Sequence, residues 1–285
     1  MAIRGYYLGC PGWGLPAWVG RLFPAGTKQK DFLARYAEVF NTVEGNTTFY
    51  ALPPHEAVAR WNEQTPDTFR FCFKFPRTVT HDKLLVDADA EVSEFFARIE
   101  PLAPKLGTLM LQLPPRFTDR ELPRLAAFLS ALPAAFHYAV ELRNEVFFVE
   151  NSVAQTAVLD LLRARGVDLV IMDTRGIHAS LSLEHADVRA RKPAFPVVPR
   201  ATGGHPIIRH VPHELLAHSL PFLAEWPARF AQWIAEGKQP YFFMHSPDDV
   251  DAPANAYTFH AMLREHTDVG ELPRWPSEPR QLGLF

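Results

Sequence analysis

The segment that decides the fold is Phe69-Arg70-Phe71-Cys72-Phe73-Lys74-Phe75. Phenylalanine occupies every second position of this segment. Because successive side chains of a β-strand point to opposite faces, the alternation predicts a strand whose four phenylalanines pack against helices. The opposite face then carries Arg70, Cys72 and Lys74, with Lys74 nearest the C-terminal end of the strand.

Similar short apolar runs recur along the chain, and helical patterns separate them. The other predicted strands are Tyr6–Gly9, Thr42–Phe49, Thr108–Leu113, Tyr138–Arg143, Leu169–Asp173, Pro206–Val211 and Tyr241–His245. The predicted helices are Lys30–Phe40, His55–Asn62, Glu91–Leu102, Arg120–Leu132, Val153–Arg165, Glu214–Glu236 and Ala254–Glu265. Strands that alternate with helices indicate parallel strands with right-handed crossovers. Eight such strands predict one (β/α)8 TIM barrel over residues 1–270.

Two features of the pattern leave alternatives. A doubly wound open sheet also alternates strands with helices, but it places a glycine-rich phosphate loop after its first strand. The segment Gly9–Gly14 carries glycines, yet Pro11 and Trp13 do not suit such a loop, and the strand count favours the barrel. The segment Thr174–Gly204 has no clear helical pattern, so we expect a long loop that can act as a lid.

Composition excludes several classes of protein. The 285 residues carry a net charge of −3, which argues against a surface that coats nucleic acid, although a local basic groove is compatible with it. Only two cysteines occur, Cys10 and Cys72, which excludes a cysteine-rich zinc site and suits a reducing compartment. No signal peptide or long apolar run is evident, so we expect a cytoplasmic protein that does not interact with membranes.

Strand alternation also predicts which side chains meet at one end of the barrel. The active sites of TIM barrels lie at the C-terminal ends of the strands. The residues expected to face the pocket there are Glu44, Asn46, Lys74, Gln112, Glu141, Arg143, Asp173, Arg209 and His245. Buried charges are costly unless they are paired, so these groups form either a structural polar plug or a binding site. We interpret the cluster as a site.

Two kinds of chemistry fit this cluster. In the first, a divalent metal is held by Glu44, Glu141, Asp173 and His81, while Lys74, Arg143 and Arg209 bind phosphate; neighbouring cations and the absence of a metal-binding spacing weigh against it. In the second, Glu44 or Glu141 acts as general base and His81 as acid, without a metal. Lys74 then binds an anion, because adjacent carboxylates raise the pKa of an amine and disfavour a Schiff base.

Residues in the loops add weaker candidates. Trp13 follows the first strand and can stack on a sugar or a base, or simply cap the barrel mouth. His81 is followed by Asp82, a pair that suits either acid–base chemistry or a turn cap. Cys10 has no obvious histidine partner, so packing is the preferred interpretation.

Several motifs resemble one known family. They are Asn41-Thr42-Val43-Glu44-Gly45-Asn46-Thr47-Thr48-Phe49-Tyr50, Arg60-Trp61, Thr65-Pro66 and Thr80-His81-Asp82, together with Phe69-Arg70-Phe71 and Lys74. On these residues the chain is similar to the domain of unknown function 72 family, also called YecE-like, over about Gly9 to Ala256. The resemblance implies a (β/α)8 barrel and no established activity.

The last fifteen residues, 271–285, form a proline-rich tail that is expected to lie outside the fold. It ends in Gln281-Leu282-Gly283-Leu284-Phe285, which resembles the peptide by which bacterial replication and repair proteins bind the DNA sliding clamp. Leu282, Leu284 and Phe285 would insert into a hydrophobic cleft of the partner, and Gln281 would bond at its rim. The alternative is that the tail folds back onto its own barrel.

Pocket and tail together predict an enzyme, a hydrolase or a lyase, that acts on a phosphorylated or nucleic-acid-related substrate. A non-catalytic nucleic-acid-associated protein recruited by the sliding clamp is the second hypothesis. A small-molecule sugar-phosphate enzyme whose tail is incidental is the third. A narrow pocket would favour the small molecule, and an open groove with a metal would favour phosphodiester cleavage.

Overall fold

The computed structural model describes residues 3–275, and within them eight parallel strands form the centre of the molecule. The strands are β1 (Tyr7–Gly9), β2 (Thr42–Gly45), β3 (Arg70–Phe73), β4 (Thr108–Gln112), β5 (His137–Glu141), β6 (Asp168–Asp173), β7 (Ile207–His210) and β8 (Tyr241–Met244). Each overlaps a strand predicted from the sequence. The expected parallel α/β architecture is therefore confirmed.

The hydrogen-bonded ladder of this sheet is in two parts. Six strands form one curled sheet in the order β1-β8-β7-β6-β5-β4, and β2 pairs with β3 in a second sheet. Few backbone bonds connect the two sheets. On one side Gly107 N donates to Phe71 O at 2.9 Å and Phe75 N donates to Met110 O at 3.0 Å, and on the other side Glu44 N donates to Cys10 O at 3.1 Å. The continuous eight-stranded ladder expected from the sequence is thus present only in part.

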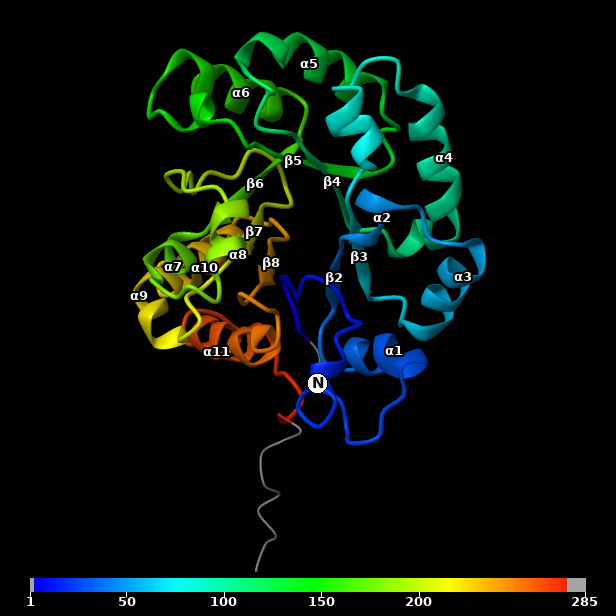
Figure 1. Ribbon diagram of the computed structural model, residues 1–285, viewed down its shortest axis with the longest axis vertical. Helices are drawn as coiled ribbons and strands as arrows, with labels where there is room; N and C mark the ends of the chain where they lie inside the picture. Colours follow the sequence, from blue (N-terminus) through cyan, green and yellow to red (C-terminus); the bar gives the residue numbers. More distant parts are fainter. Residues whose placement is uncertain (1–2, 276–285) are drawn as a thin grey trace, which may run out of the picture.

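Helices surround the strands in chain order, which gives the ring seen in Figure 1. The longer helices are α1 (Phe32–Ala37), α3 (His55–Gln64), α4 (Asp89–Ile99), α5 (Leu122–Ala131), α6 (Val153–Ala164), α10 (Trp226–Ala235) and α11 (Ala252–Arg264). The short helices are α2 (Thr47–Tyr50), α7 (Arg175–Ala179), α8 (Ala186–Arg191) and α9 (Leu220–Leu223). The longer helices bury apolar side chains in the core, whereas α8 has no buried residue.

The alternation in β3 sorts its side chains as the sequence predicts. Phe69, Phe71, Phe73 and Phe75 are fully buried in the core between sheet and helices. Cys72 belongs instead to a smaller apolar cluster enclosed by the strands. The other members of that inner cluster are Met110, Ala139, Val170, Ile207, Tyr241 and Phe243. These two clusters therefore lie on opposite faces of the curled sheet, and a third, small cluster consists of Met172, Ile177 and Val211.

Three predicted elements differ in the structure. The strand predicted over Thr42–Phe49 ends at Gly45, because Asn46 adopts a helical conformation (φ −82°, ψ −13°) and α2 follows. The segment Thr174–Gly204 contains α7 and α8 rather than only a loop. The helix predicted over Glu214–Glu236 is divided into shorter helices, since α9 and α10 each have a proline in the first turn, where no backbone donor is needed.

The chain after α11 packs against that helix as far as the structure describes it. Tyr257 in α11 donates a hydrogen bond to Pro273 O at 2.7 Å, and its ring meets the edge of Trp275 at 4.9 Å. The four residues predicted to bind a partner, Gln281, Leu282, Leu284 and Phe285, lie outside the described residues. Among residues 3–275, no helix has the length and apolar character needed to cross a bilayer.

Candidate functional site

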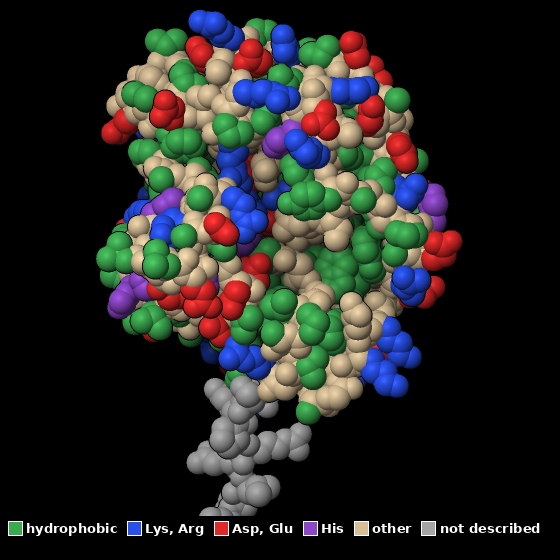
Figure 2. All heavy atoms as spheres, in the orientation of Figure 1, with side chains coloured by type: hydrophobic (Ala, Val, Ile, Leu, Met, Phe, Trp, Pro, Cys, Tyr) green, Lys and Arg blue, Asp and Glu red, His purple; other side chains and the backbone are tan. Residues whose placement is uncertain are grey.

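A polar pocket of about 360 Å³ lies at the C-terminal ends of the strands. It includes six of the residues that strand alternation assigns to it, namely Asn46, Lys74, Gln112, Arg143, Arg209 and His245. Figure 2 shows a hollow near the centre of the drawn face, over the strands of Figure 1, with lysine, arginine and histidine side chains around it. The predicted convergence of polar side chains on one cavity is therefore present.

Arg209 binds both glutamates of the site. Its Nε and one terminal nitrogen donate to the two carboxylate oxygens of Glu44 at 2.7 and 2.6 Å. The other terminal nitrogen donates to Glu141 Oε2 at 2.6 Å. Both glutamate side chains are fully buried beneath the pocket, and Arg209 is nearly so. One guanidinium thus bridges carboxylates from β2 and β5.

Two further cations complete this network. Lys74 Nζ donates to Gln112 Oε1 at 2.9 Å and lies 3.5 Å from Glu44 Oε1. Arg143 makes an ion pair with Glu141. Glu44 therefore has Arg209 and Lys74 beside it, and Glu141 has Arg209 and Arg143. The charges that strand alternation predicts do pair here, as the polar-plug interpretation requires, but the cations also line an accessible cavity.

Both glutamates stay ionised in this environment. Burial alone raises the pKa of Glu44, but the positive charges of Arg209 and Lys74 outweigh it and hold that pKa well below its ordinary value. Burial likewise opposes ionisation of Glu141, and Arg143 and Arg209 nevertheless lower its pKa to about 2. Carboxylates this acidic and this enclosed are poor proton acceptors at neutral pH. They fit a role in positioning the cations better than the role of general base.

The pKa values of His245 and Lys74 are lowered as well, which for these bases favours the neutral form. Burial lowers the pKa of His245 to about 3, although its Nε2 lies 3.3 Å from Glu44 Oε2. Burial, followed by the charge of Arg209, lowers the pKa of Lys74 to about 8, in spite of Glu44 and Glu141. The expectation that neighbouring carboxylates keep the pKa of Lys74 high is therefore wrong, because desolvation and the guanidinium are the stronger influences.

Asp173 does not share the pocket, so its expected position is wrong. Its carboxylate accepts hydrogen bonds from Arg175 Nε at 2.9 Å and from Trp226 Nε1 of α10 at 2.8 Å, and His210 Nδ1 lies 3.2 Å away. These bonds to Arg175 and His210 hold the pKa of Asp173 below its ordinary value, against the effect of burial. β6 is apolar on both faces, so alternation gave no contrast. Its inner face carries Val170 instead.

His81 and Trp13 lie near the pocket but are not part of its lining. His81 belongs to the turn Thr78–Asp82, has Thr80 Oγ1 at 3.0 Å from Nδ1, and meets the ring of Phe49 edge to face. Burial and then Arg77 lower the pKa of His81 to about 4, so the neutral ring is a weak general acid at neutral pH. Trp13 packs edge to face on Trp61 at 5.0 Å, which supports the capping interpretation.

The donor set does not fit a divalent metal. Among residues 3–275, no three histidine, cysteine, aspartate or glutamate side chains are grouped closely enough to hold an ion. Glu44 and Glu141 already bind cationic side chains, and Asp173 points away from them. The four proposed metal ligands, which also include His81, are therefore not brought together. We derive no chemical step through a metal.

Eight residues of the pocket lining were not predicted, among them Arg191, Lys192, Ser246 and Asp249. Arg191 is the last residue of α8 and Lys192 follows it, and Ser246 and Asp249 follow β8. Burial, followed by Arg209, lowers the pKa of Lys192 to about 8. Burial raises the pKa of Asp249 to about 6, and its Oδ1 lies 3.8 Å from His245 Nδ1. The Arg-Lys pair and the Asp-Asp pair are visible in the sequence, but nothing local indicates that these loops reach the pocket.

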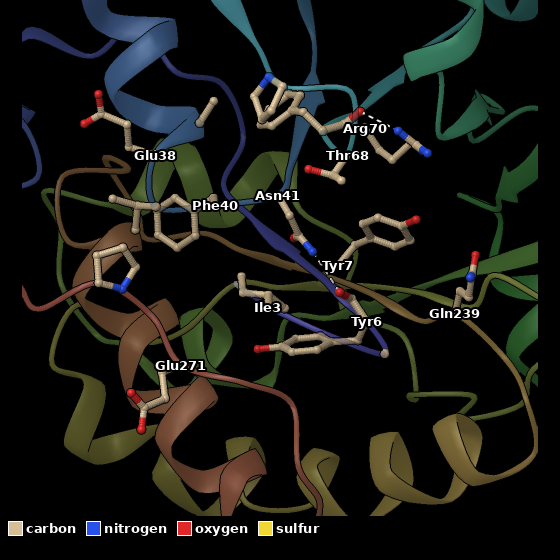
Figure 3. A pocket seen from close by; sticks show the side chains of 16 residues that line it. Ile3, Tyr6, Tyr7, Glu38, Phe40, Asn41, Thr68, Arg70, Gln239 and Glu271 are labelled. Carbon is tan, nitrogen blue, oxygen red and sulfur yellow. Dashed lines mark hydrogen bonds between the residues drawn. The ribbon is translucent and has the colours of Figure 1, made fainter. Parts of the chain in front are cut away.

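A second pocket of about 390 Å³ lies at the opposite, N-terminal ends of the strands. Figure 3 shows Tyr7, Asn41 and Arg70 among the side chains that line it. Asn41 donates to Tyr6 O at 2.9 Å and accepts from Leu8 N at 2.8 Å. Arg70 donates to two backbone carbonyl oxygens at 2.7 and 2.9 Å. These polar groups hold the main chain in place.

Comparison with known proteins gives consistent matches over almost the whole chain. The family model described as "Protein of unknown function DUF72" matches residues 7–280. The chain is 42% identical over 281 residues to the UPF0759 protein YecE of Escherichia coli K12, which covers 98% of this chain and 99% of that protein. Two solved structures of DUF72 family proteins are similar in fold. The one from Enterococcus faecalis has a TM-score of 0.67 at 18% identity and covers 94% of this chain and 99% of its own. The one from Thermotoga maritima has a TM-score of 0.66 at 24% identity and covers 91% of this chain and 99% of its own.

Proposed function

This chain belongs to the DUF72 family of proteins of unknown function, and from that premise and the charges of its pocket we propose that it is an enzyme acting on a small phosphorylated substrate. The reaction class that suits the pocket best is that of a lyase working by acid–base chemistry without a metal. Hydrolysis of the same class of substrate is the alternative reaction.

The observation that carries this proposal is the surplus of positive charge. Five cationic side chains line the pocket, namely Lys74, Arg143, Arg191, Lys192 and Arg209. The carboxylates at or beneath it are three, Glu44, Glu141 and Asp249. The cations thus exceed the carboxylates by two, which matches the charge of a phosphate monoester at neutral pH. Arginine and lysine side chains are the usual partners of phosphate oxygens.

The size of the pocket supports a small molecule rather than a nucleic-acid strand. A volume of about 360 Å³ is at the lower end of the range for small-molecule sites. The acid–base groups within it are limited by their environments. Asp249 has a raised pKa of about 6 and 37% side-chain exposure, which makes it the carboxyl group best suited to transfer a proton. Glu44 and Glu141 hold Arg209, Lys74 and Arg143 in place.

Calorimetric titration tests this function directly. We expect glycerol 3-phosphate to bind the full chain at least about tenfold more tightly than glycerol, with inorganic phosphate as a competitor. Arg143→Gln should weaken that binding about tenfold or more, because it removes a cation from the lining. Arg35→Gln, which removes an exposed cation of α1, is the matched control and should leave it unchanged. Equal affinity for glycerol and its phosphate would reject the proposal.

The same bonds between the two sheets support a finer description of the fold as a (β/α)8 barrel. Phe75 to Met110 and Glu44 to Cys10 occupy the two positions at which an eight-stranded ladder would close. The ring of helices in chain order is compatible with that description (Figure 1). Amide exchange of Phe75 and Glu44 as slow as that of β7 would support closure. Fast exchange at both would favour an open, two-part sheet.

A second candidate function rests on the C-terminal sequence. We propose that Gln281-Leu282-Gly283-Leu284-Phe285 binds the bacterial DNA sliding clamp, which would recruit the protein to DNA as an enzyme or as a non-catalytic associate. The test compares the full chain with a chain lacking Gln281–Phe285, and with Phe285→Ala, in an affinity assay on immobilised clamp. Loss of binding in both variants is expected. Equal weak binding by all three proteins would reject it.

A further inference from the structure

The amine of Lys74 lies at the base of the pocket, between a neutral acceptor and a carboxylate. Its side chain is 6% exposed, so the alkyl stem is buried while Nζ borders the cavity. Nζ donates to Gln112 Oε1 at 2.9 Å, and Glu44 Oε1 lies 3.5 Å away. Lys74 directly follows β3, which is fixed by the buried phenylalanines on its other face. The amine is therefore held at one defined position.

The surroundings of this amine make part of it nucleophilic at neutral pH. With a pKa lowered to about 8, roughly a tenth of the amine is unprotonated at pH 7, far more than for an ordinary lysine. Desolvation and a nearby cation are the known means of activating a lysine toward carbonyl compounds. In this pocket Arg209 is that cation, since its charge adds to the effect of burial on Lys74.

We propose that Lys74 attacks a carbonyl carbon of the phosphorylated substrate and forms an imine with it. This inference rests on the proposed function, because the phosphate bound by Arg143, Arg191 and Lys192 is what brings the carbonyl group to the amine. The substrate class is then a phosphorylated aldehyde or ketone. A covalent imine draws electrons away from the neighbouring carbon–carbon bond, which is the chemistry that a lyase requires.

The step balances without a further reagent. The lone pair of unprotonated Nζ adds to the carbonyl carbon, and the carbon–oxygen π pair moves to oxygen, which takes a proton. The nitrogen then transfers one of its two protons to the same oxygen, which leaves as water, and the nitrogen lone pair forms the carbon–nitrogen double bond. Asp249 is the group of the lining that can supply the proton, since its pKa of about 6 leaves part of it protonated. The cationic imine keeps one N–H for Gln112 and one positive charge opposite Glu44.

Lys192 is the competing amine, because its pKa is lowered to about 8 as well. It lies in the chain that follows α8, outside the sheet, and its side chain is partly exposed. Lys74 is instead fixed at the end of a strand and bonded to Gln112. We assign Lys192 to the phosphate and Lys74 to the carbonyl, and mapping the modified residue distinguishes the two.

Reductive trapping tests this assignment. The full chain is incubated with glyceraldehyde 3-phosphate, reduced with borohydride and mapped by peptide mass spectrometry. We expect the reduced adduct on Lys74, at least about tenfold above the exposed Lys28, which reports background labelling. Glyceraldehyde without the phosphate should label Lys74 at least about tenfold less, and inorganic phosphate should protect it. Lys74→Arg, which keeps the charge but cannot form the imine, should abolish the adduct.

The outcomes separate this inference from the proposed function. Tight binding of glycerol 3-phosphate without an adduct on Lys74, or with the adduct on Lys192, would overturn the imine and leave the phosphate site standing. The absence of any preference for phosphorylated probes, in binding and in trapping, would overturn both. Mapping of the unmodified chain decides the matter even where Lys74→Arg fails to fold. Melting curves of that variant show whether it does.

Discussion

The pockets at the two ends of the strands have similar volumes, about 390 Å³ at the N-terminal end and about 360 Å³ at the C-terminal end. Their polar side chains are used differently. Asn41 and Arg70 at the N-terminal end bond to backbone groups, so they serve the fold. At the C-terminal end, Arg209 and Lys74 bond to other side chains, and the cations outnumber the carboxylates. Volume therefore does not distinguish a binding site from a packing defect. Charged side chains that are not bonded to the main chain do distinguish the two.

The largest expected difference between the two ends is in stability. Arg209→Met leaves Glu44 and Glu141 buried without their bridging guanidinium, so we expect the free energy of unfolding to fall by about 3–5 kcal/mol. Arg70→Met at the other end removes bonds to carbonyl groups near solvent and should cost about 1 kcal/mol. Urea unfolding measures both. Equal losses would mean that the ends do not differ in this respect.

Asp173 tests whether a position at the C-terminal end of a strand is enough to make a residue part of the binding site. It lies at the C-terminal end of β6 but points outward. Asp173→Asn weakens the charged bond to Arg175, and we expect a loss of about 2 kcal/mol in the free energy of unfolding. Because the folded-state pKa of Asp173 is depressed, this stabilisation is present above about pH 4 and is lost as the pH falls below it.

Binding of glycerol 3-phosphate by Asp173→Asn should be unchanged, since the carboxylate contacts α10 rather than the pocket. Calorimetry at pH 7 checks this second expectation. A large loss of affinity in a variant that still folds would mean that Asp173 belongs to the binding site, and it would contradict the outward position of this side chain.

The pH dependence of binding tests the charge of the pocket itself. Lys74 and Lys192 have pKa values lowered to about 8, so both lose their charge as the pH rises through that value. We expect the affinity for glycerol 3-phosphate to fall about tenfold between about pH 7 and about pH 9.5. A variant with both lysines replaced by arginine should bind with little pH dependence. A flat profile in the unmodified chain would remove these lysines from the anion site.

A pH-dependent contribution to stability is predicted at the N-terminal end of β6. Burial raises the pKa of Asp168 to about 7, although its carboxylate accepts from Gly203 N at 3.1 Å and His205 N at 2.9 Å. Between about pH 4 and pH 7 the unfolded chain has lost this proton and the folded chain keeps it, so stability falls as the pH rises. Asp168→Asn should remove a slope of about 1 kcal/mol per pH unit over this range. Asp268→Asn, at the exposed surface of the same end, serves as the control. An unchanged slope in Asp168→Asn would contradict the assignment.

The fold could be predicted from the sequence wherever a strand had two unlike faces. β3 alternates phenylalanine with polar or small residues, so its inward and outward sides were both correct. β6 reads Asp-Leu-Val-Ile-Met-Asp and is buried on both sides, so its alternation carried no information and Asp173 was placed on the wrong side. The requirement for glycine at position 45 depends on space rather than pattern. A Cβ there would lie 2.4 Å from the ring of Phe73, which only the folded structure reveals.

The site could be predicted only as far as it lies on strands. Six of the nine residues placed by alternation line the pocket, and Glu44 and Glu141 lie beneath it. Arg191 ends the short helix α8, and Lys192 and Asp249 lie on loops, and the reach of these segments depends on contacts distant in sequence. The direction of the pKa shift of Lys74 could not be predicted either. It depends on the balance between burial, Arg209 and two carboxylates, and no residue pattern contains that balance.

The bridge made by Arg209 has a mechanical consequence. Glu44 belongs to the two-stranded sheet, whereas Arg209 and Glu141 belong to the six-stranded one, and few backbone bonds connect these sheets. Cohesion across that boundary therefore depends strongly on the ionic state of a few side chains. We expect a bound anion that draws Arg209 toward itself to weaken this boundary, which faster amide exchange in β2 and β3 would report. Binding of an anion in the pocket and local opening between the two sheets would then be coupled.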